Sequence, residues 1–231
     1  MFCDRCGTQV NAGQQFCPNC GQSFAGAPAA SGFAPPPAWT PPVGVQVASG
    51  RWIGAGWELV KADMGSYVLA TLIFFLLSSV PFIQGALITG FHIFTMKKIA
   101  GRRAEFADLF KGFNYFIPTL VAMLLISVFT MIGTIFCIIP GLVVAAALKF
   151  TYLFIVDKRM DFWPAMEASH AIVKQDYFGF TMFLILLFLV NVLGALCCIV
   201  GLLVTFPLSI AAITVAYKEI VGFEQRTIDA L

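Results

Sequence analysis

Three long stretches of the sequence contain no Asp, Glu, Lys or Arg, and they constrain the fold more than any other feature. They cover residues 64–96, 112–148 and 177–217, which makes them 33, 37 and 41 residues long. The chain is 59% hydrophobic and 11% charged, whereas a soluble domain carries about 25% charged residues. Apolar stretches of this length predict an integral membrane protein.

Each stretch is too long for one membrane-spanning helix, which needs about 20 residues, and close to the length of two. Turn-forming residues lie near the middle of each, in SSVPFIQG, CIIPG and CCIVG. We therefore predict an all-α transmembrane bundle of about six spans, arranged as three hairpins over residues 64–96, 112–156 and 177–218. The first hairpin is the tightest, so the sequence leaves open whether it crosses the bilayer or re-enters.

The basic residues favour hairpins over three single spans. They cluster between the first and second stretches (Lys97, Lys98, Arg102, Arg103, Lys111) and again between the second and third (Lys158, Arg159, Lys174). Single spans would place these clusters on opposite sides of the membrane, against the cytoplasmic preference of Lys and Arg. Hairpins place both clusters on one side, which predicts a multi-pass protein of the cell membrane with both termini in the cytoplasm. The start MFCDRC also lacks the pattern of a signal peptide.

The second and third hairpins look like diverged repeats. The sequences YFIPTLVAMLLISVFTMIGTIFCIIPGL and YFGFTMFLILLFLVNVLGALCCIVGLL align, and they match Gly133 with Gly194 and Gly141 with Gly201. A short amphipathic segment precedes each hairpin, and we expect these segments to lie in the headgroup layer. Their predicted apolar faces are Ile53, Trp57, Val60 and Met64; Phe106, Leu109, Phe110 and Phe113; and Phe162, Met166, His170 and Val173.

The polar head, residues 1–24, carries two Cys-x-x-Cys pairs. Cys3, Cys6, Cys17 and Cys20 have the spacing of four thiolate ligands that close a tetrahedral site around one structural Zn²⁺ ion. So short a segment cannot build a sufficient core, so the metal supplies its folding energy. Disulfides or a redox motif are the alternatives, but cytoplasmic conditions favour thiolates. Gly7 suits the tight turn after the first pair, because glycine tolerates positive φ.

The knuckles CDRCG and CPNCG resemble the short zinc-ribbon family found at the N-termini of many prokaryotic membrane proteins. Asp4 and Arg5 are the only charged residues of this head, so we expect no nucleic-acid partner. Residues 25–50 form an uncharged linker rich in Ala, Pro and Gly, which predicts a semi-rigid tether to the membrane domain, residues 51–231. The three prolines before Trp39 could instead be a ligand for a proline-binding module.

Two segments of the membrane domain also resemble a known group of proteins. PFIQGALITGFHIFTMKKIAGRRAEFADLFKGF and the later VDKRMDFWPAMEASHAIVKQDYFGF resemble an uncharacterised group of prokaryotic multi-pass domains. These are akin to the membrane domain attached to some glycerophosphodiester phosphodiesterases. The shared features are a Pro-x-x-x-Gly turn, a Gly-Arg loop leading to DLFKGF, and Asp157 followed by a helix with Ala165 and Ser169. The resemblance implies a membrane topology and no activity, because no phosphodiesterase catalytic domain accompanies it.

Few polar residues lie inside the predicted hairpins, where they are the first candidates for function. Lys149 lies eight residues before Asp157, which favours a lysine that reaches the interface from the end of a span. His92 lies near the same interface, and Asn191 suits a hydrogen bond between helices. The alternative is a polar transport site formed by Lys149, His92 and Asn191. No catalytic triad or pair of membrane carboxylates is recognisable, so we do not expect an enzyme.

Cys137, Cys197 and Cys198 lie at the turns of the second and third hairpins. A disulfide from Cys137 to Cys197 or Cys198 is possible, but buried thiols are favoured because free cysteine behaves as a small hydrophobe. The sequence as a whole favours a non-catalytic membrane protein with a cytoplasmic zinc-ribbon contact module on a helical scaffold or regulator. Its expected partners are the lipid bilayer and a cytoplasmic or membrane protein. A transporter or channel for a small or lipid-like substrate is the alternative, and a metal or redox sensor ranks third.

Overall fold

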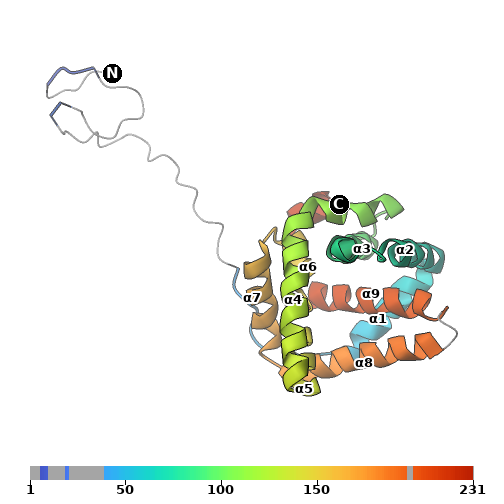
Figure 1. The fold of residues 1–231 in the computed structure, drawn as a ribbon. Helices are drawn as coiled ribbons and strands as arrows, with labels where there is room; N and C mark the ends of the chain where they lie inside the picture. The colour runs from blue at the N-terminus through green and yellow to red at the C-terminus, as the bar shows by residue number, and fades with distance from the viewer. Residues whose placement is uncertain (1–5, 10–18, 21–38, 197–199, 231) are drawn as a thin grey trace. The chain divides into compact units, whose positions relative to one another are not determined.

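The structure is a computed structural model, and it describes residues 6–9, 19–20, 39–196 and 200–230. The chain divides into two compact units, Met1–Thr40 and Pro41–Leu231, which are described separately. The boundary between the two units falls inside the predicted linker. In the described part of the second unit, every regular element is a helix (Figure 1), as the apolar stretches predict.

The helices follow one another along the whole second unit with short connections. In chain order they are α1 (Ser49–Ala62), α2 (Met64–Leu77), η1 (Pro81–Ile83), α3 (Gln84–Ile99), η2 (Phe106–Tyr115), α4 (Phe116–Phe136), α5 (Ile138–Ala147), α6 (Thr151–Asp157), α7 (Phe162–Val173), α8 (Tyr177–Leu196), α9 (Leu202–Ile220) and α10 (Gln225–Ala230). The elements labelled η are 3₁₀ helices.

Four segments are long and apolar enough to cross a membrane: Phe106–Phe136, Ile138–Asp157, Tyr177–Leu196 and Leu202–Ile220. They correspond to the two arms of the second and third predicted hairpins. A fifth candidate is the pair α1 and α2, which is bent by 97°. The arms of the first hairpin, α2 and α3, have 14 and 16 residues. Such helices are roughly 21 and 24 Å long, short of a hydrocarbon core of about 30 Å.

The predicted bundle of six spans is therefore not confirmed. In Figure 1, α8 and α9 lie side by side, whereas α4 runs across their direction, so the hairpins do not share one axis. The helix α3 is mostly buried inside the protein, where it packs against η2, α4 and α9. Its length is consequently set by its protein neighbours as much as by any bilayer.

The turns of the second and third hairpins use the glycines that the repeat alignment matched. A Cβ atom on Gly133 would lie 3.0 Å from Gly141 Cα, so the two arms approach at their backbones. In the third hairpin, a Cβ atom on Gly201 would lie 2.8 Å from Gly194 Cα. Small residues let helix backbones approach in this way. The same arrangement in both turns supports the predicted repeat.

The first amphipathic segment, α1, packs into the protein instead of lying only at its surface. Its buried residues are Trp52, Gly56 and Val60, whereas Trp57, on the predicted apolar face, is 38% exposed. A Cβ atom on Gly56 would lie 2.9 Å from the backbone nitrogen of Ala212, so α1 lies directly on α9. The predicted apolar face was right for Val60, whereas Trp52 and Gly56 are buried in place of Ile53 and Trp57, because a glycine contact with α9 determines which side of α1 is buried.

The amphipathic segment α7 matches its prediction in part. Met166 and Val173 are buried as expected, and Asp161 caps the helix by accepting a hydrogen bond from the Phe162 N–H at 2.8 Å. His170, however, is exposed, and its Nε2 lies 2.6 Å from the Tyr177 hydroxyl. The imidazole thus pairs with the first residue of α8 and does not belong to the apolar face.

Candidate functional site

The described part of the head shows how the two cysteine knuckles meet. The Thr8 hydroxyl oxygen lies 3.3 Å from Cys6 Sγ, and it accepts a hydrogen bond from the Asn19 side-chain amide at 3.2 Å. Asn19 immediately precedes Cys20, so one threonine links both knuckles. Gly7 has φ +68°, the left-handed conformation that the tight turn was expected to need.

The other two predicted ligands, Cys3 and Cys17, lie outside the described residues. The four-sulfur set therefore stays a prediction. Thr8, two residues after Cys6, contacts Asn19, the residue before Cys20, and this contact between the two knuckles fits a shared metal ion. If bound there, Zn²⁺ would supply the cross-link that folds this short segment.

A buried ion pair joins η2 to α3. The Asp108 carboxylate lies 2.7 Å from Lys97 Nζ and 2.9 Å from Lys111 Nζ, and it accepts the Glu105 backbone N–H at 2.8 Å. The side chains of Lys97 and Asp108 are only 9% and 3% exposed. This network gives the motif DLFKGF a structural role, because it contains both Asp108 and Lys111.

Two glycines allow η2 to approach α3 at the level of the backbone. A Cβ atom on Gly112 would lie 2.5 Å from the Gly90 nitrogen, and no real Cβ atom comes so close to a neighbour. Leu109 is buried against α3, whereas Phe106 and Phe110, on the predicted apolar face, are 36% and 49% exposed. The predicted face was right for Leu109 and Phe113 and wrong for Phe106 and Phe110, because Asp108 and Gly112 share the inward side of η2.

A second buried carboxylate, Asp157, fastens the C-terminal segment. Its two oxygens accept hydrogen bonds from the Tyr217 hydroxyl at 3.0 Å and from the Glu224 N–H at 2.9 Å. Lys158 Nζ lies 3.1 Å from the same carboxylate, and the Thr227 hydroxyl donates to the Asp157 carbonyl at 2.9 Å. Asp157 thus connects the end of α6 to the end of α9 and the segment that follows it.

Charged residues from segments far apart in the sequence meet through further ion pairs. Lys98, at the end of α3, pairs with Asp63, at the bend between α1 and α2. Arg102, which follows α3, lies 3.8 Å from Asp229 in α10. The segment before the second hairpin therefore contacts both the start of the first hairpin and the C-terminal segment.

Two of the three polar candidates have different hydrogen-bond partners. His92 is 2% exposed, and its Nδ1 lies 2.8 Å from the Thr214 hydroxyl of α9. Asn191 donates hydrogen bonds to the Ser209 hydroxyl at 2.6 Å and to the Leu187 carbonyl at 2.7 Å. No contact between His92 and Asn191 is recorded in the described ranges.

Lys149 lies at a break between α5 and α6, and not at the end of a span. The helix resumes at Thr151 and reaches Asp157, so Lys149 is in the interior of the candidate span Ile138–Asp157. Ser169 of α7 holds the break. Its hydroxyl donates to the Ala147 carbonyl at 2.7 Å and accepts the Phe150 N–H at 3.1 Å.

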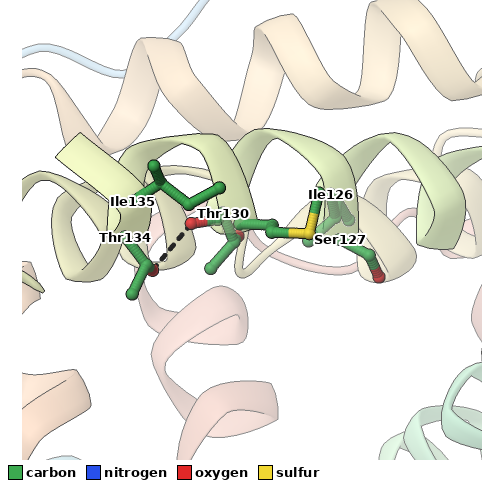
Figure 2. Close-up of a pocket in the computed structure, with 6 residues that line it drawn as sticks. Ile126, Ser127, Thr130, Thr134 and Ile135 are labelled. Atoms are coloured by element: carbon green, nitrogen blue, oxygen red, sulfur yellow. Dashed lines mark hydrogen bonds between the residues drawn. The ribbon is translucent and has the colours of Figure 1, made fainter.

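A shallow pocket of about 580 Å³ lies along α4 (Figure 2). Its lining comes from this one helix: Ile126, Ser127, Thr130, Met131, Thr134 and Ile135. The Thr134 hydroxyl donates to the Thr130 carbonyl at 2.7 Å, a bond within the helix. None of the three polar candidates lines this pocket. Cys137, one residue beyond α4, is exposed and not the buried thiol that was expected, and Cys197 and Cys198 lie outside the described residues.

Comparison with known proteins identifies the family of the head. Residues 2–24 match the zinc-ribbon domain family. The chain is 25% identical over 122 residues to the uncharacterized protein Rv2560 of Mycobacterium tuberculosis. The matched region covers 53% of this chain and 37% of that protein. It is 28% identical over 122 residues to the uncharacterized protein Mb2590 of Mycobacterium bovis, with the same coverage. The chain therefore matches little more than a third of these relatives, and no solved structure matches it.

These findings establish an N-terminal zinc-ribbon domain and a similarity to proteins of unknown function. The resemblance to the membrane domain of glycerophosphodiester phosphodiesterases stays a prediction. The sequence pattern did not indicate the roles of Asp108 and Asp157 in the fold, because their partners come from other helices. Both residues lie just outside the apolar stretches. A sharper signal was available in DLFKGF, where an acid and a lysine stand three residues apart beside a glycine.

Proposed function

We propose that this chain is a non-catalytic integral protein of the cell membrane whose zinc ribbon is a cytoplasmic contact module. Residues 25–50 would tether this module to a helical body that acts as a scaffold or regulator. The bilayer and a cytoplasmic or membrane protein would be its partners. The observation that carries the proposal is a zinc-ribbon domain placed before apolar helices whose charged segments meet through ion pairs.

The ion pairs support one shared side of the membrane for residues 63, 98, 102 and 229, and the cytoplasmic preference of Lys and Arg assigns that side to the cytoplasm. The pairs Lys98–Asp63 and Arg102–Asp229 can form only if the segments they join lie on the same side of the membrane. Labelling of engineered cysteines with a reagent that cannot cross membranes tests this topology. Cysteines at Arg102 and Arg159 should react from the same face in sealed vesicles. Reaction from opposite faces would refute the hairpin arrangement.

The contact role of the head is tested by cross-linking in cells. Full-length chain, a chain lacking residues 1–24 and a Cys6→Ser, Cys20→Ser variant should be compared. The variant keeps the length of the head and removes two metal ligands. We expect both altered chains to lose the same cross-linked protein and to stay in the membrane. An unchanged set of cross-linked proteins would contradict the contact role without affecting the topology.

A transporter or channel for a small or lipid-like substrate is the second candidate. The break between α5 and α6 favours it, because discontinuous helices form the substrate sites of many transporters. The dispersed positions of His92 and Asn191 speak against one shared polar site. Flux measured in proteoliposomes, with a Lys149→Met variant as the matched control, would separate this candidate from a scaffold.

A further inference from the structure

Lys149 brings a positive charge into an apolar part of the protein. The candidate span Ile138–Asp157 has 20 residues, and Lys149 lies eight residues before its charged end. That separation corresponds to about 12 Å along a helix. The side chain of Lys149 is exposed, whereas its neighbours Leu148 and Phe150 are 8% and 1% exposed.

The break that presents Lys149 is a fixed part of the fold. The Ser169 hydroxyl bonds to backbone groups on both sides of the break, and the Thr151 hydroxyl donates to the Leu148 carbonyl at 2.8 Å. Ser169 and Thr151 are both fully buried. Hydroxyl groups that satisfy a broken helix in this way make the break stable in an apolar environment.

No acidic side chain of the described residues forms an ion pair with Lys149. The buried carboxylates are already engaged elsewhere, Asp108 by Lys97 and Asp157 by Lys158. An ammonium group in apolar surroundings needs a counter-charge, and the described side chains do not provide one.

We propose that Lys149 binds the anionic headgroup of a membrane amphiphile, a carboxylate or a phosphate whose alkyl chain stays in the surrounding lipid. The alkyl chain explains why the site lies within an apolar segment, and the ammonium group explains the preference for an anion. The inference rests on the membrane location in the proposed function and is independent of the role of the zinc ribbon.

Native mass spectrometry of the full chain in detergent tests the inference. The probes are oleate, dioleoyl phosphatidic acid, the neutral lipid dioleoyl phosphatidylcholine and inorganic phosphate. We expect one equivalent of oleate or of phosphatidic acid to bind saturably, and the preferred probe identifies the headgroup as carboxylate or phosphate. Phosphatidylcholine and inorganic phosphate should bind at least tenfold more weakly, since hydrogen bonds to charged groups account for about that much affinity.

Variants assign the binding to Lys149. Lys149→Met keeps the length of the side chain and should weaken binding about tenfold or more, whereas Lys149→Arg should retain it. Lys174→Gln, at an exposed lysine that follows α7, is the matched control and should bind like the native chain. Circular dichroism checks that each variant is folded.

Three results would overturn the inference: unchanged binding by Lys149→Met, an equal loss in Lys174→Gln, or binding of inorganic phosphate alone. A chain that is released from membranes by alkaline carbonate would instead refute the membrane location. That outcome is read before any lipid is added, so the two failures are distinguishable.

Discussion

Replacement of Asp108 by Asn tests whether a buried ion pair holds η2 against α3. The carboxylate lies 2.7 Å from Lys97 Nζ and 2.9 Å from Lys111 Nζ. The side chain of Lys97 is 9% exposed, whereas that of Lys111 is 42% exposed. Asp108→Asn preserves the shape of the side chain and removes its charge, so the ammonium group of Lys97 stays buried without a counter-charge.

Loss of the ion pair with Lys97 and loss of the ion pair with Lys111 should reduce the stability of the protein by very different amounts. Loss of one partner of a buried pair destabilises a protein by about 3–5 kcal/mol, whereas an exposed pair contributes about 0–1 kcal/mol. In a chain of this size, 1 kcal/mol changes the melting temperature by about 2–4 °C. We therefore expect Asp108→Asn to lower the melting temperature by roughly 6–20 °C and Lys111→Met to lower it by about 4 °C at most.

Thermal unfolding in detergent, followed by circular dichroism, measures both variants under the same conditions. A double variant, Lys97→Met with Asp108→Leu, should recover most of the lost stability, because apolar residues can replace a buried ion pair. Equal losses in Asp108→Asn and Lys111→Met would refute the assignment of the stabilising contact to Lys97. An unchanged melting temperature in Asp108→Asn would show that η2 is held by packing alone.

Three further predictions follow from the packing, the C-terminal segment and the head. Gly112→Ala should cost about 1–3 kcal/mol by forcing η2 away from α3, whereas Gly54→Ala, which has nothing within 4 Å, should be neutral or stabilising in the same melting assay. Asp157→Asn should weaken the attachment of the C-terminal segment, and limited proteolysis should then cleave near Gly222 faster than in the native chain; equal cleavage rates would contradict this attachment. A strong zinc chelator should abolish protease resistance of residues 1–24 and leave the melting of the helical body unchanged, with one zinc per chain released by elemental analysis; a change in the melting of the body would show that the head stabilises it.

Local features of the sequence predicted local features of the fold well. Apolar stretches without charge gave helices, as α4, α8 and α9 show. Repeated glycines also marked backbone contacts, since Gly133 approaches Gly141 as Gly194 approaches Gly201. Each of these features depends on residues close together in the sequence, so the chain itself carries the information.

Contacts between distant residues could not be predicted in the same way. Helical periodicity indicated which side of η2 is apolar, but the buried side is determined by Lys97 and Gly90 of another helix. Likewise, nothing in the sequence around His92 indicates that its partner is Thr214, 122 residues away. Helical periodicity therefore indicates which face of a helix is apolar, but it does not identify the helix that packs against that face.

The distribution of charge links the proposed topology to the proposed lipid site. In the described residues, most ion pairs join segments that follow or precede the apolar helices, such as Lys98–Asp63 and Arg102–Asp229. There the cost of burying an ion is offset by a partner from another segment. Lys149 lies within an apolar segment, where the described residues provide a hydroxyl-stabilised break and no carboxylate partner. The fold pairs the buried lysine Lys97 with Asp108, whereas no acid of the described residues pairs with the exposed Lys149, so this position is arranged to receive an anion from outside the chain.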